Sequence, residues 1–446
     1  MPSETQSDNP VTFGTSGIRG PVGDEVTASV ALAVGRALGV DTTRVVVGRD
    51  PRESGKALVD ALSAGLRESG TDVVDLGLAA TPTIARAVSW EDADAGAAVT
   101  ASHNPAQDNG IKLWQPTGQA FDADLREAIE TRIEQSQSAL ADWDGFGDRI
   151  ARDYTETHCE QIVSEVTVTE PLSVVVDVGN GAGGVTADAL GKLGCELNTL
   201  NAQPDGTFPG RPSEPTAEHC EALTTQVAYS DAALGIAHDG DADRMRAVTA
   251  DGEFLSGDEL LAILAREAAE PGERVAVPVD TSLAVEDHLD DAGIETTRTP
   301  VGDVYVAQRA SEPDVGFGGE PSGAWIWPDA TLCPDGPLAA CKLVSLAANR
   351  PLGDRRDDIE TYPIHRDSIE VSDKAATMTA VHERVTEQYD DISMMDGVRV
   401  DRGDGWFLLR ASGTQPLVRI TAEARDTERA SQLFEEASTI LSKSLD

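Results

Sequence analysis

The sequence VTASHNPAQDNGIK places three chemically versatile side chains within one short segment: Ser102, His103 and Lys112. A serine hydroxyl becomes a nucleophile when a base or a cation lies nearby, and a lysine can carry protons where its surroundings lower its pKa. The segment also follows an apolar run and contains Pro, Asn and Gly, which are typical of turns. From the local sequence alone, a turn is the simpler interpretation, and Ser102 is a candidate nucleophile.

A second segment, AHDGDADRM, spaces three carboxylates at every other position: Asp239, Asp241 and Asp243. An EF-hand loop begins similarly, but its sixth and twelfth positions would be Arg244 and Ala250 instead of Gly and Glu. Carboxylates this close repel one another unless a cation lies among them, and oxygen ligands of this kind suit Mg²⁺. The sequence therefore indicates a magnesium site, with a solvated acidic turn as the alternative.

A third segment, RASGTQPLVR, has the composition of a phosphate-binding turn. Hydroxyls and backbone N–H groups in the turn can bind an anion, and flanking arginines can donate paired hydrogen bonds to it. The candidate residues are Arg410, Ser412, Gly413, Thr414 and Arg419. A plain hairpin turn is the alternative interpretation.

Three further glycine-rich segments are weaker signals. TFGTSGIRG repeats the combination of hydroxyls, glycines and one arginine, Arg19, while GFGGEPSGAW offers Glu320 and Ser322, which suit the hydroxyl groups of a sugar. From the local sequence alone, an ordinary turn is the favoured interpretation of the second segment. VDVGNGAGG has the G-x-G-x-x-G spacing of a dinucleotide-binding loop, but no clean acidic residue follows about 20 positions later, as that interpretation requires.

The segments that carry these residues adjoin strand-like and helix-like patterns. Three β-branched runs predict buried strands, and each is followed by helical spacing of apolar residues. The strands are 44–50, 173–179 and 274–280, and the helices are 54–70, 184–194 and 282–293. This alternation predicts an α/β fold with three similar domains that contain mixed, mostly parallel sheets. The C-terminal part, with strands at 405–412 and 416–424 and a helix at 427–442, predicts a smaller α+β domain.

The chain of 446 residues is too long for one hydrophobic core. We predict four domains from the changes in pattern. Domain I, residues 1–146, carries the serine segment, and domain II, residues 147–250, carries the aspartates. Domain III, residues 251–362, carries the sugar-type loop, and domain IV, residues 363–446, carries the phosphate-type turn.

The composition restricts the partners and the environment. The chain has 78 acidic and 35 basic residues, a net charge of −43, which argues against nucleic acid as a partner. Concentrated salt would screen this charge, so we expect a cytoplasm of very high salt, as in halophilic archaea. The five cysteines lack CxxC spacing, which predicts reduced thiols. No apolar run predicts a signal peptide or a membrane span.

Taken together and in this order, TSGIR, TASHNP, DGDADR, GEPSG and RASGTQP resemble the motifs of the α-D-phosphohexomutase family. The resemblance spans nearly the whole chain, from Phe13 to Arg419. It implies four domains around a central cleft. It also implies an isomerase that interconverts a hexose 1-phosphate and a hexose 6-phosphate, with Mg²⁺ and a hexose 1,6-bisphosphate that serves as intermediate and activator.

The resemblance also implies roles for individual residues. Ser102 would carry a phosphate, donate it to the free hydroxyl of the substrate, and accept the other phosphate back. Ser102 and the three aspartates would bind Mg²⁺, while Lys112, assisted by His103, would move protons, and Arg19 and Arg244 would bind the transferring group. The substrate-binding residues would be Gly302, Asp303, Glu320, Ser322, Arg410, Ser412, Gly413, Thr414 and Arg419.

The substrate is less clearly indicated. VGDVYV, residues 301–306, resembles the corresponding loop of phosphoglucosamine mutases, which favours glucosamine 6-phosphate and glucosamine 1-phosphate. Two departures weaken this prediction, because Ala324 stands where a His is common and Gln415 where Glu is common. Phosphomannomutase or phosphoglucomutase activity is the first alternative. A phosphatase or a non-catalytic sugar-phosphate-binding protein is the second, and either a monomer or a homodimer fits.

Overall fold

The computed structural model describes residues 12–412 and 416–445. The chain forms two compact units, each made from two separate stretches of sequence. Unit 1 comprises Met1–Leu255 and Ser322–Asp354, and unit 2 comprises Ser256–Pro321 and Arg355–Asp446. Both units contain the strand and helix alternation that the sequence predicts.

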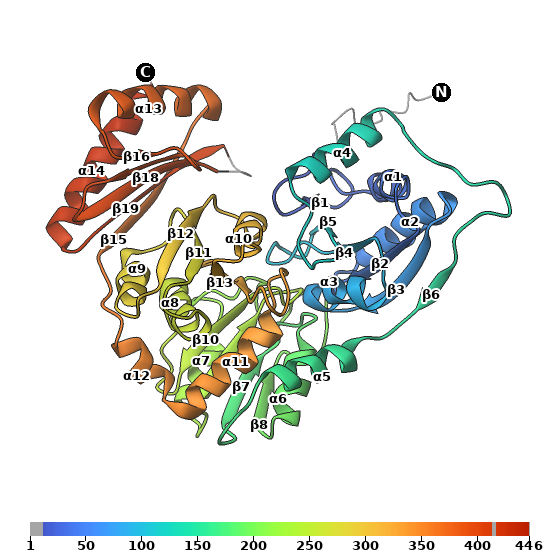
Figure 1. The fold of residues 1–446 in the computed structure, drawn as a ribbon, viewed down its shortest axis with the longest axis horizontal. Coiled ribbons are helices and arrows are strands. Elements are labelled where there is room, and N and C mark those ends of the chain that lie inside the picture. The colour runs from blue at the N-terminus through green and yellow to red at the C-terminus, as the bar shows by residue number, and fades with distance from the viewer. Residues whose placement is uncertain (1–11, 413–415, 446) are drawn as a thin grey trace. The chain divides into compact units, whose positions relative to one another are not determined.

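The first part of unit 1 is a mixed six-stranded sheet (Figure 1). In spatial order its strands are β1 (Ile18–Pro21), β5 (Asp108–Trp114), β4 (Ala95–Val99), β2 (Arg44–Arg49), β3 (Asp72–Leu78) and β6 (Arg149–Ala151). Strand β2 pairs in parallel with β3 and β4, whereas β5 is antiparallel to both β4 and β1. The helices of this part are α1 (Ala28–Leu38), α2 (Gly55–Glu68), α3 (Thr81–Trp90) and α4 (Ala123–Glu134). The valines of β2 are buried in the core because the strand is covered on both faces.

The second part of unit 1 is a four-stranded sheet with a hairpin at one edge. Its order is β10 (Met245–Thr249), β9 (Leu234–His238), β7 (Ser173–Asp177) and β8 (Glu196–Leu200), and only β10 and β9 are antiparallel. The helices are α5 (Thr155–Glu165), α6 (Gly184–Lys192) and α7 (Glu221–Ala228). Strand β14 (Trp325–Ile326) and helix α11 (Gly336–Asn349), from the later stretch of sequence, complete the unit, and α11 contacts α6.

Unit 2 begins with a parallel arrangement in which β11 (Arg274–Pro278) lies between β12 (Glu295–Thr299) and β13 (Val315–Gly319). Its helices are α8 (Gly257–Ala268), α9 (Leu283–Asp290) and α10 (Asp303–Ala310). The short helix α12 (Leu352–Asp357) follows α11 in the chain.

The C-terminal part of unit 2 is an antiparallel five-stranded sheet. Its order is β15 (Ile364–Glu370), β19 (Leu417–Ala424), β18 (Gly405–Ala411), β17 (Val398–Asp401) and β16 (Ile392–Ser393). Helices α13 (Lys374–Gln388) and α14 (Thr427–Lys443) pack on one face of this sheet and form a common apolar core with it (Figure 1). The opposite face carries part of the candidate site.

These elements confirm the predicted fold class of α/β domains with mostly parallel sheets and a C-terminal α+β domain. Strands β2, β7 and β11 begin at the predicted residues, because each run of valines provides a side chain for both buried faces. The five cysteines are free and buried, as predicted. Within residues 12–412 and 416–445, no helix has the length and apolar character required to cross a membrane.

Candidate functional site

The loop after β4 holds Ser102 in a conformation that most residues avoid. Ser102 has a φ of 50° and is 1% exposed. Its backbone N–H donates to Thr100 Oγ1 at 2.8 Å, and its carbonyl oxygen accepts from Arg52 Nη2 at 2.9 Å and from Ser213 Oγ at 2.6 Å. A strained backbone of this kind costs about 1–3 kcal/mol and persists only where its surroundings hold it. The three hydrogen bonds supply that restraint.

Arg52 donates several of the hydrogen bonds that hold the loop of Ser102 in place. Its guanidinium pairs with Asp50 at 2.8 Å and, beyond Ser102, donates to the carbonyl oxygens of Asn104, Pro105 and Asp108. The side chain is completely buried. The sequence analysis missed Arg52. The available signal was an Asp and an Arg two residues apart at the end of a buried strand, in a chain poor in basic residues.

Ser102 lies next to the three aspartates that the sequence singles out. Asp239, Asp241 and Asp243 occupy the turn between β9 and β10, and all three are buried. One ligand atom from each lies within 4.8 Å of the others. Ser102 Oγ donates to Asp239 Oδ2 at 2.6 Å, so the hydroxyl belongs to the same cluster. The structure thus brings together residues that are 137 positions apart in the chain.

The electrostatics of this cluster fit a divalent cation. Burial, together with the neighbouring Asp243 and Asp241 carboxylates, raises the pKa of Asp239. Asp241 Oδ2 accepts from Thr81 Oγ1 at 2.6 Å, but the buried Oδ1 atom has no hydrogen-bond partner among the described residues. A metal ion would offset the repulsion and satisfy that oxygen. The residues present can therefore hold a metal ion.

Three arginines place positive charge near His103, the residue that follows Ser102. The charge of Arg244, then burial, then the charges of Arg19 and Arg52 lower the pKa of His103 to about 2. His103 Nδ1 lies 3.4 Å from Ser102 Oγ. The imidazole is consequently neutral near pH 7, and the guanidinium charges favour an anion beside the serine hydroxyl.

Lys112 is buried in the centre of β5, at 3% exposure. Its Nζ lies 4.7 Å from the centre of the Trp114 ring, which is a favourable position for a cation. A buried lysine of this kind has the desolvated surroundings that proton transfer requires. Its role as a proton carrier stays a prediction.

The glycine-rich loop after β7 packs against the turn that carries the three aspartates. Ala182 N donates to the carbonyl oxygen of Gly240 at 2.9 Å, and a Cβ on Gly181 would lie 2.7 Å from that oxygen. Gly179 has a φ of 64°, which glycine adopts without strain. Close approach of two loops accounts for these glycines without a bound dinucleotide.

In unit 2, Glu320 is joined to the loop that the sequence links with substrate choice. A Glu320 carboxylate oxygen accepts from Gly302 N at 2.6 Å, where Gly302 has a φ of 135° and precedes α10. Asp303 is the first residue of that helix. Ser322 belongs to unit 1. Ala324, which stands where a His is common in the family motif, is buried, and its backbone forms an isolated β-bridge with Arg244, which is also in unit 1.

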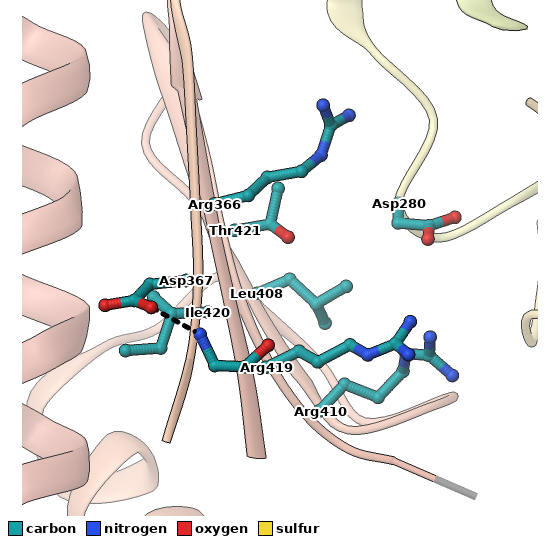
Figure 2. Close-up of a pocket in the computed structure, with 9 residues that line it drawn as sticks. Asp280, Arg366, Asp367, Leu408, Arg410, Arg419, Ile420 and Thr421 are labelled. Atoms are coloured by element: carbon teal, nitrogen blue, oxygen red, sulfur yellow. Dashed lines mark hydrogen bonds between the residues drawn. The ribbon is translucent and has the colours of Figure 1, made fainter. Parts of the chain in front are cut away.

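The predicted phosphate-binding arginines line a pocket of about 420 Å³ on the C-terminal sheet. Arg410 on β18 and Arg419 on β19 lie directly opposite each other in the strand ladder. Figure 2 shows them with Arg366 on the face of the sheet away from its helices. Two like charges in this register are unfavourable without an anion. Ser412 is buried beside them, whereas Gly413 and Thr414 lie outside the described residues.

Two more residues of unit 2 connect to this pocket and were missed by the sequence analysis. Asp396 lies 3.5 Å from Arg410 and accepts from Val301 N at 3.0 Å, which ties the arginine to the loop that contains Gly302. Lys374 Nζ donates to the carbonyl oxygen of Ser412 at 2.6 Å. Lys374 is one of only six lysines in the chain, and this scarcity was the available signal.

Comparison with known sequences identifies the relatives of this chain. Four domains described as phosphoglucomutase/phosphomannomutase match in order: domain I at residues 10–140, domain II at 152–252, domain III at 256–362 and the C-terminal domain at 368–440. A probable phosphoglucosamine mutase of Methanopyrus kandleri is 46% identical over 437 residues, covering 95% of this chain and 96% of that protein. The probable phosphoglucosamine mutase of Methanococcoides burtonii is 44% identical, with 97% and 99% covered.

Solved structures agree with these relatives. A phosphoglucomutase/phosphomannomutase family protein from Burkholderia thailandensis superposes with a TM-score of 0.88 at 28% identity, covering 98% of each chain. The structure described as a putative phosphomannomutase from Thermus thermophilus gives a TM-score of 0.82 at 26% identity, covering 97% of this chain and 99% of that one. The chain therefore belongs to the phosphoglucomutase/phosphomannomutase family, which confirms the α-D-phosphohexomutase resemblance of its motifs.

Proposed function

We propose that this chain is an isomerase that interconverts glucosamine 6-phosphate and glucosamine 1-phosphate through a phosphoserine at position 102 and a glucosamine 1,6-bisphosphate intermediate. The observation that carries the proposal is the hydrogen bond from Ser102 Oγ to Asp239, inside a buried carboxylate cluster and beside guanidinium charges. The names of the archaeal relatives support glucosamine phosphate as the substrate.

The reaction consists of two phosphoryl transfers. In the first, a sugar hydroxyl oxygen attacks the phosphorus of phosphoserine, the bond from phosphorus to Ser102 Oγ breaks, and the hydroxyl proton leaves. In the second, after the bisphosphate has turned over, Ser102 Oγ attacks the phosphorus of the other phosphate, the bond from that phosphorus to the sugar oxygen breaks, and the sugar oxygen takes up a proton. Lys112 moves the proton in each transfer, and Arg19 and Arg244 donate hydrogen bonds to the transferring group. His103, held neutral, braces the loop or assists Lys112.

Asp239, Asp241, Asp243 and Ser102, or the phosphate it carries, hold Mg²⁺ in this proposal. When bound there, Mg²⁺ would supply positive charge that offsets the charge of the transferring phosphoryl group. The proposed ligand set rests on the clustering of the carboxylates and on the buried oxygen of Asp241.

Several further residues bind the substrate. The phosphate that is not being transferred binds Arg410 and Arg419 together with the turn formed by Ser412, Gly413 and Thr414. Glu320 and Ser322 bind sugar hydroxyls, and Gly302 and Asp303 also bind the substrate. We keep the predicted division into domains 1–146, 147–250, 251–362 and 363–446, and a cytoplasmic monomer or homodimer, as part of the proposal.

Turnover of a panel of sugar phosphates tests the proposal. The full chain is incubated with Mg²⁺, a hexose 1,6-bisphosphate, concentrated KCl, and glucosamine, glucose or mannose phosphate. We expect isomerisation of glucosamine phosphate and phosphate on residue 102 by mass spectrometry. Ser102→Ala should lower kcat by at least about a thousandfold, whereas the buried Ser63→Ala, remote from the site in α2, serves as control.

The outcome separates the alternatives. Preference for glucose or mannose phosphate would replace glucosamine as the substrate but keep the mutase mechanism. Release of free phosphate without isomer would indicate a phosphatase, and binding without turnover would indicate a binding protein. Retained activity in Ser102→Ala, without phosphate on residue 102, would contradict the assigned nucleophile.

A further inference from the structure

The register of the C-terminal sheet gathers three arginines on one face. Arg419 lies opposite Arg410 on one side and Ser368 on the other, and Arg366 lies opposite Thr421, two residues along β19. Because side chains alternate between faces along a strand, these five residues share one face, away from α13 and α14. This face is the floor of the pocket of about 420 Å³ (Figure 2).

The same face is covered at its other end by the loop after β11. Trp406 and Leu408 of β18 pack in an apolar cluster with Val279, and the carbonyl oxygen of Val279 accepts from buried Arg399. The next residue, Asp280, therefore reaches the pocket beside Leu408. Figure 2 shows Asp280 across the pocket from the arginines.

Asp280 has no cationic partner in ion-pair contact. Within the part of the chain that the structure describes, no lysine, arginine or histidine nitrogen lies within 4.0 Å of its carboxylate. The nearby guanidinium groups have other partners, since Arg410 lies 3.5 Å from Asp396 and Arg366 lies 4.0 Å from Asp258. Burial raises the pKa of Asp280, and the charges of Arg410 and Arg366 oppose that rise.

In a pocket that binds only phosphate, the Asp280 carboxylate would add nothing to the binding affinity. A phosphate dianion on Arg410 and Arg419 would take up their charge and also repel Asp280. A ligand with a cation close to its phosphate would remove that conflict. Among hexose phosphates, a 2-amino sugar 1-phosphate has this arrangement, because its ammonium group lies on the carbon next to the phosphorylated one.

We propose that Asp280 binds the ammonium group of a 2-amino-2-deoxyhexose 1-phosphate whose phosphate lies on Arg410 and Arg419. The inference rests on the proposed mutase function and adds a residue that selects the amino sugar. Arg366 completes the pocket by balancing the carboxylate when no substrate is bound. Neutral hexose phosphates and their N-acetylated relatives lack the cation that Asp280 binds.

The test compares sugars in Asp280→Asn, which keeps the shape of the side chain and removes its charge. Binding of glucosamine 1-phosphate, glucose 1-phosphate and N-acetylglucosamine 1-phosphate is measured by calorimetry in a Ser102→Ala background, so that turnover does not interfere. We expect Kd for glucosamine 1-phosphate to rise about tenfold or more, and Kd for the other two to change by less than about threefold or to fall. Asp390→Asn, an exposed acidic residue after α13, controls for net charge.

Equal changes for all three sugars, or no change for glucosamine 1-phosphate, would overturn the role of Asp280. That result is separate from the proposed function, which fails if the wild-type chain isomerises no hexose phosphate. Asp280→Ser provides a second variant if the asparagine variant does not fold, and circular dichroism checks both. The same selectivity should appear in kcat/KM with Ser102 intact, as a loss confined to the amino sugar.

Discussion

Replacing Ser213 with alanine would remove one hydroxyl that joins the loop of Ser102 to the turn that carries the three aspartates. Ser213 is 2% exposed, and its Oγ donates to the carbonyl oxygen of Ser102 at 2.6 Å and accepts from Gly240 N at 3.0 Å. Gly240 lies between Asp239 and Asp241 in the chain. The hydroxyl thus fixes the distance between the proposed nucleophile and its proposed metal ligands.

The size of the effect follows from what remains after the change. The Ser102 carbonyl keeps its bond from Arg52, but the Gly240 N–H loses its partner in a buried place. An unsatisfied buried donor costs about 1–3 kcal/mol. If this cost falls on the geometry of the transfer step, it corresponds to roughly fivefold to a hundredfold in rate. A shift of about 1 Å in the position of a reacting group has a similar effect.

The assay is steady-state turnover of glucosamine phosphate together with the occupancy of phosphate on Ser102. We expect Ser213→Ala to lower kcat by about fivefold to a hundredfold, with KM changed by less than about threefold, because both hydrogen bonds of the Ser213 hydroxyl go to the backbone. Ser63→Ala is the matched control, since Ser63 is equally buried and its hydroxyl has no hydrogen-bond partner among the described residues. A fall in kcat no larger than that of Ser63→Ala would refute the positioning role.

Three other changes have expected outcomes. Asp241→Asn should raise the Mg²⁺ concentration for half-maximal activity by about tenfold or more, and an unchanged titration would remove Asp241 from the ligand set. Burial acts to raise the pKa of Asp335, but His158 and Arg86 outweigh it and lower that pKa below the usual value. The resulting stability is present above about pH 4, the unfolded pKa, and is lost as pH falls through the folded pKa. Asp335→Asn should therefore lower the free energy of unfolding of unit 1 by about 3–5 kcal/mol at pH 7. The loss should become smaller as the pH falls towards the folded pKa, and denaturant unfolding at pH 7 and at a series of acidic pH values measures it. The free energy of unfolding should rise with KCl concentration, because 43 excess negative charges repel one another in dilute buffer, and full stability without salt would contradict the predicted saline cytoplasm.

The strands and helices were predictable wherever local pattern decides them. The valine runs of β2, β7 and β11 indicate buried strands, and the helices that follow have Ser54, Gly183 and Ser282 at their N-caps. The packing of segments that lie far apart in the sequence was not predictable in this way. Residues 322–354 belong with unit 1, since α11 packs on α6, and such a contact between distant segments leaves no periodic signal in either one.

The residues of the candidate site also fall into those that the sequence could predict and those that it could not. Ser102 and the aspartates were identified because side-chain chemistry requires those residue types at those spacings, and the structure places the serine hydroxyl on Asp239. Arg52 and Ser213 were missed because both act on the carbonyl oxygen of Ser102, and every residue has a carbonyl oxygen. A contact to backbone can be made by any donor at any sequence separation, so only coordinates reveal it.

Each unit of this acidic chain contains clustered positive charge. Arg19, Arg52 and Arg244 gather around His103 in unit 1, and Arg410 and Arg419 face each other across a strand ladder in unit 2. Both arrangements oppose folding, because like charges close together raise the energy of the folded chain. A chain with 78 carboxylates has ample means to neutralise these arginines, yet Arg419 forms no ion pair with any described residue. A bound anion would offset the repulsion between the neighbouring arginines.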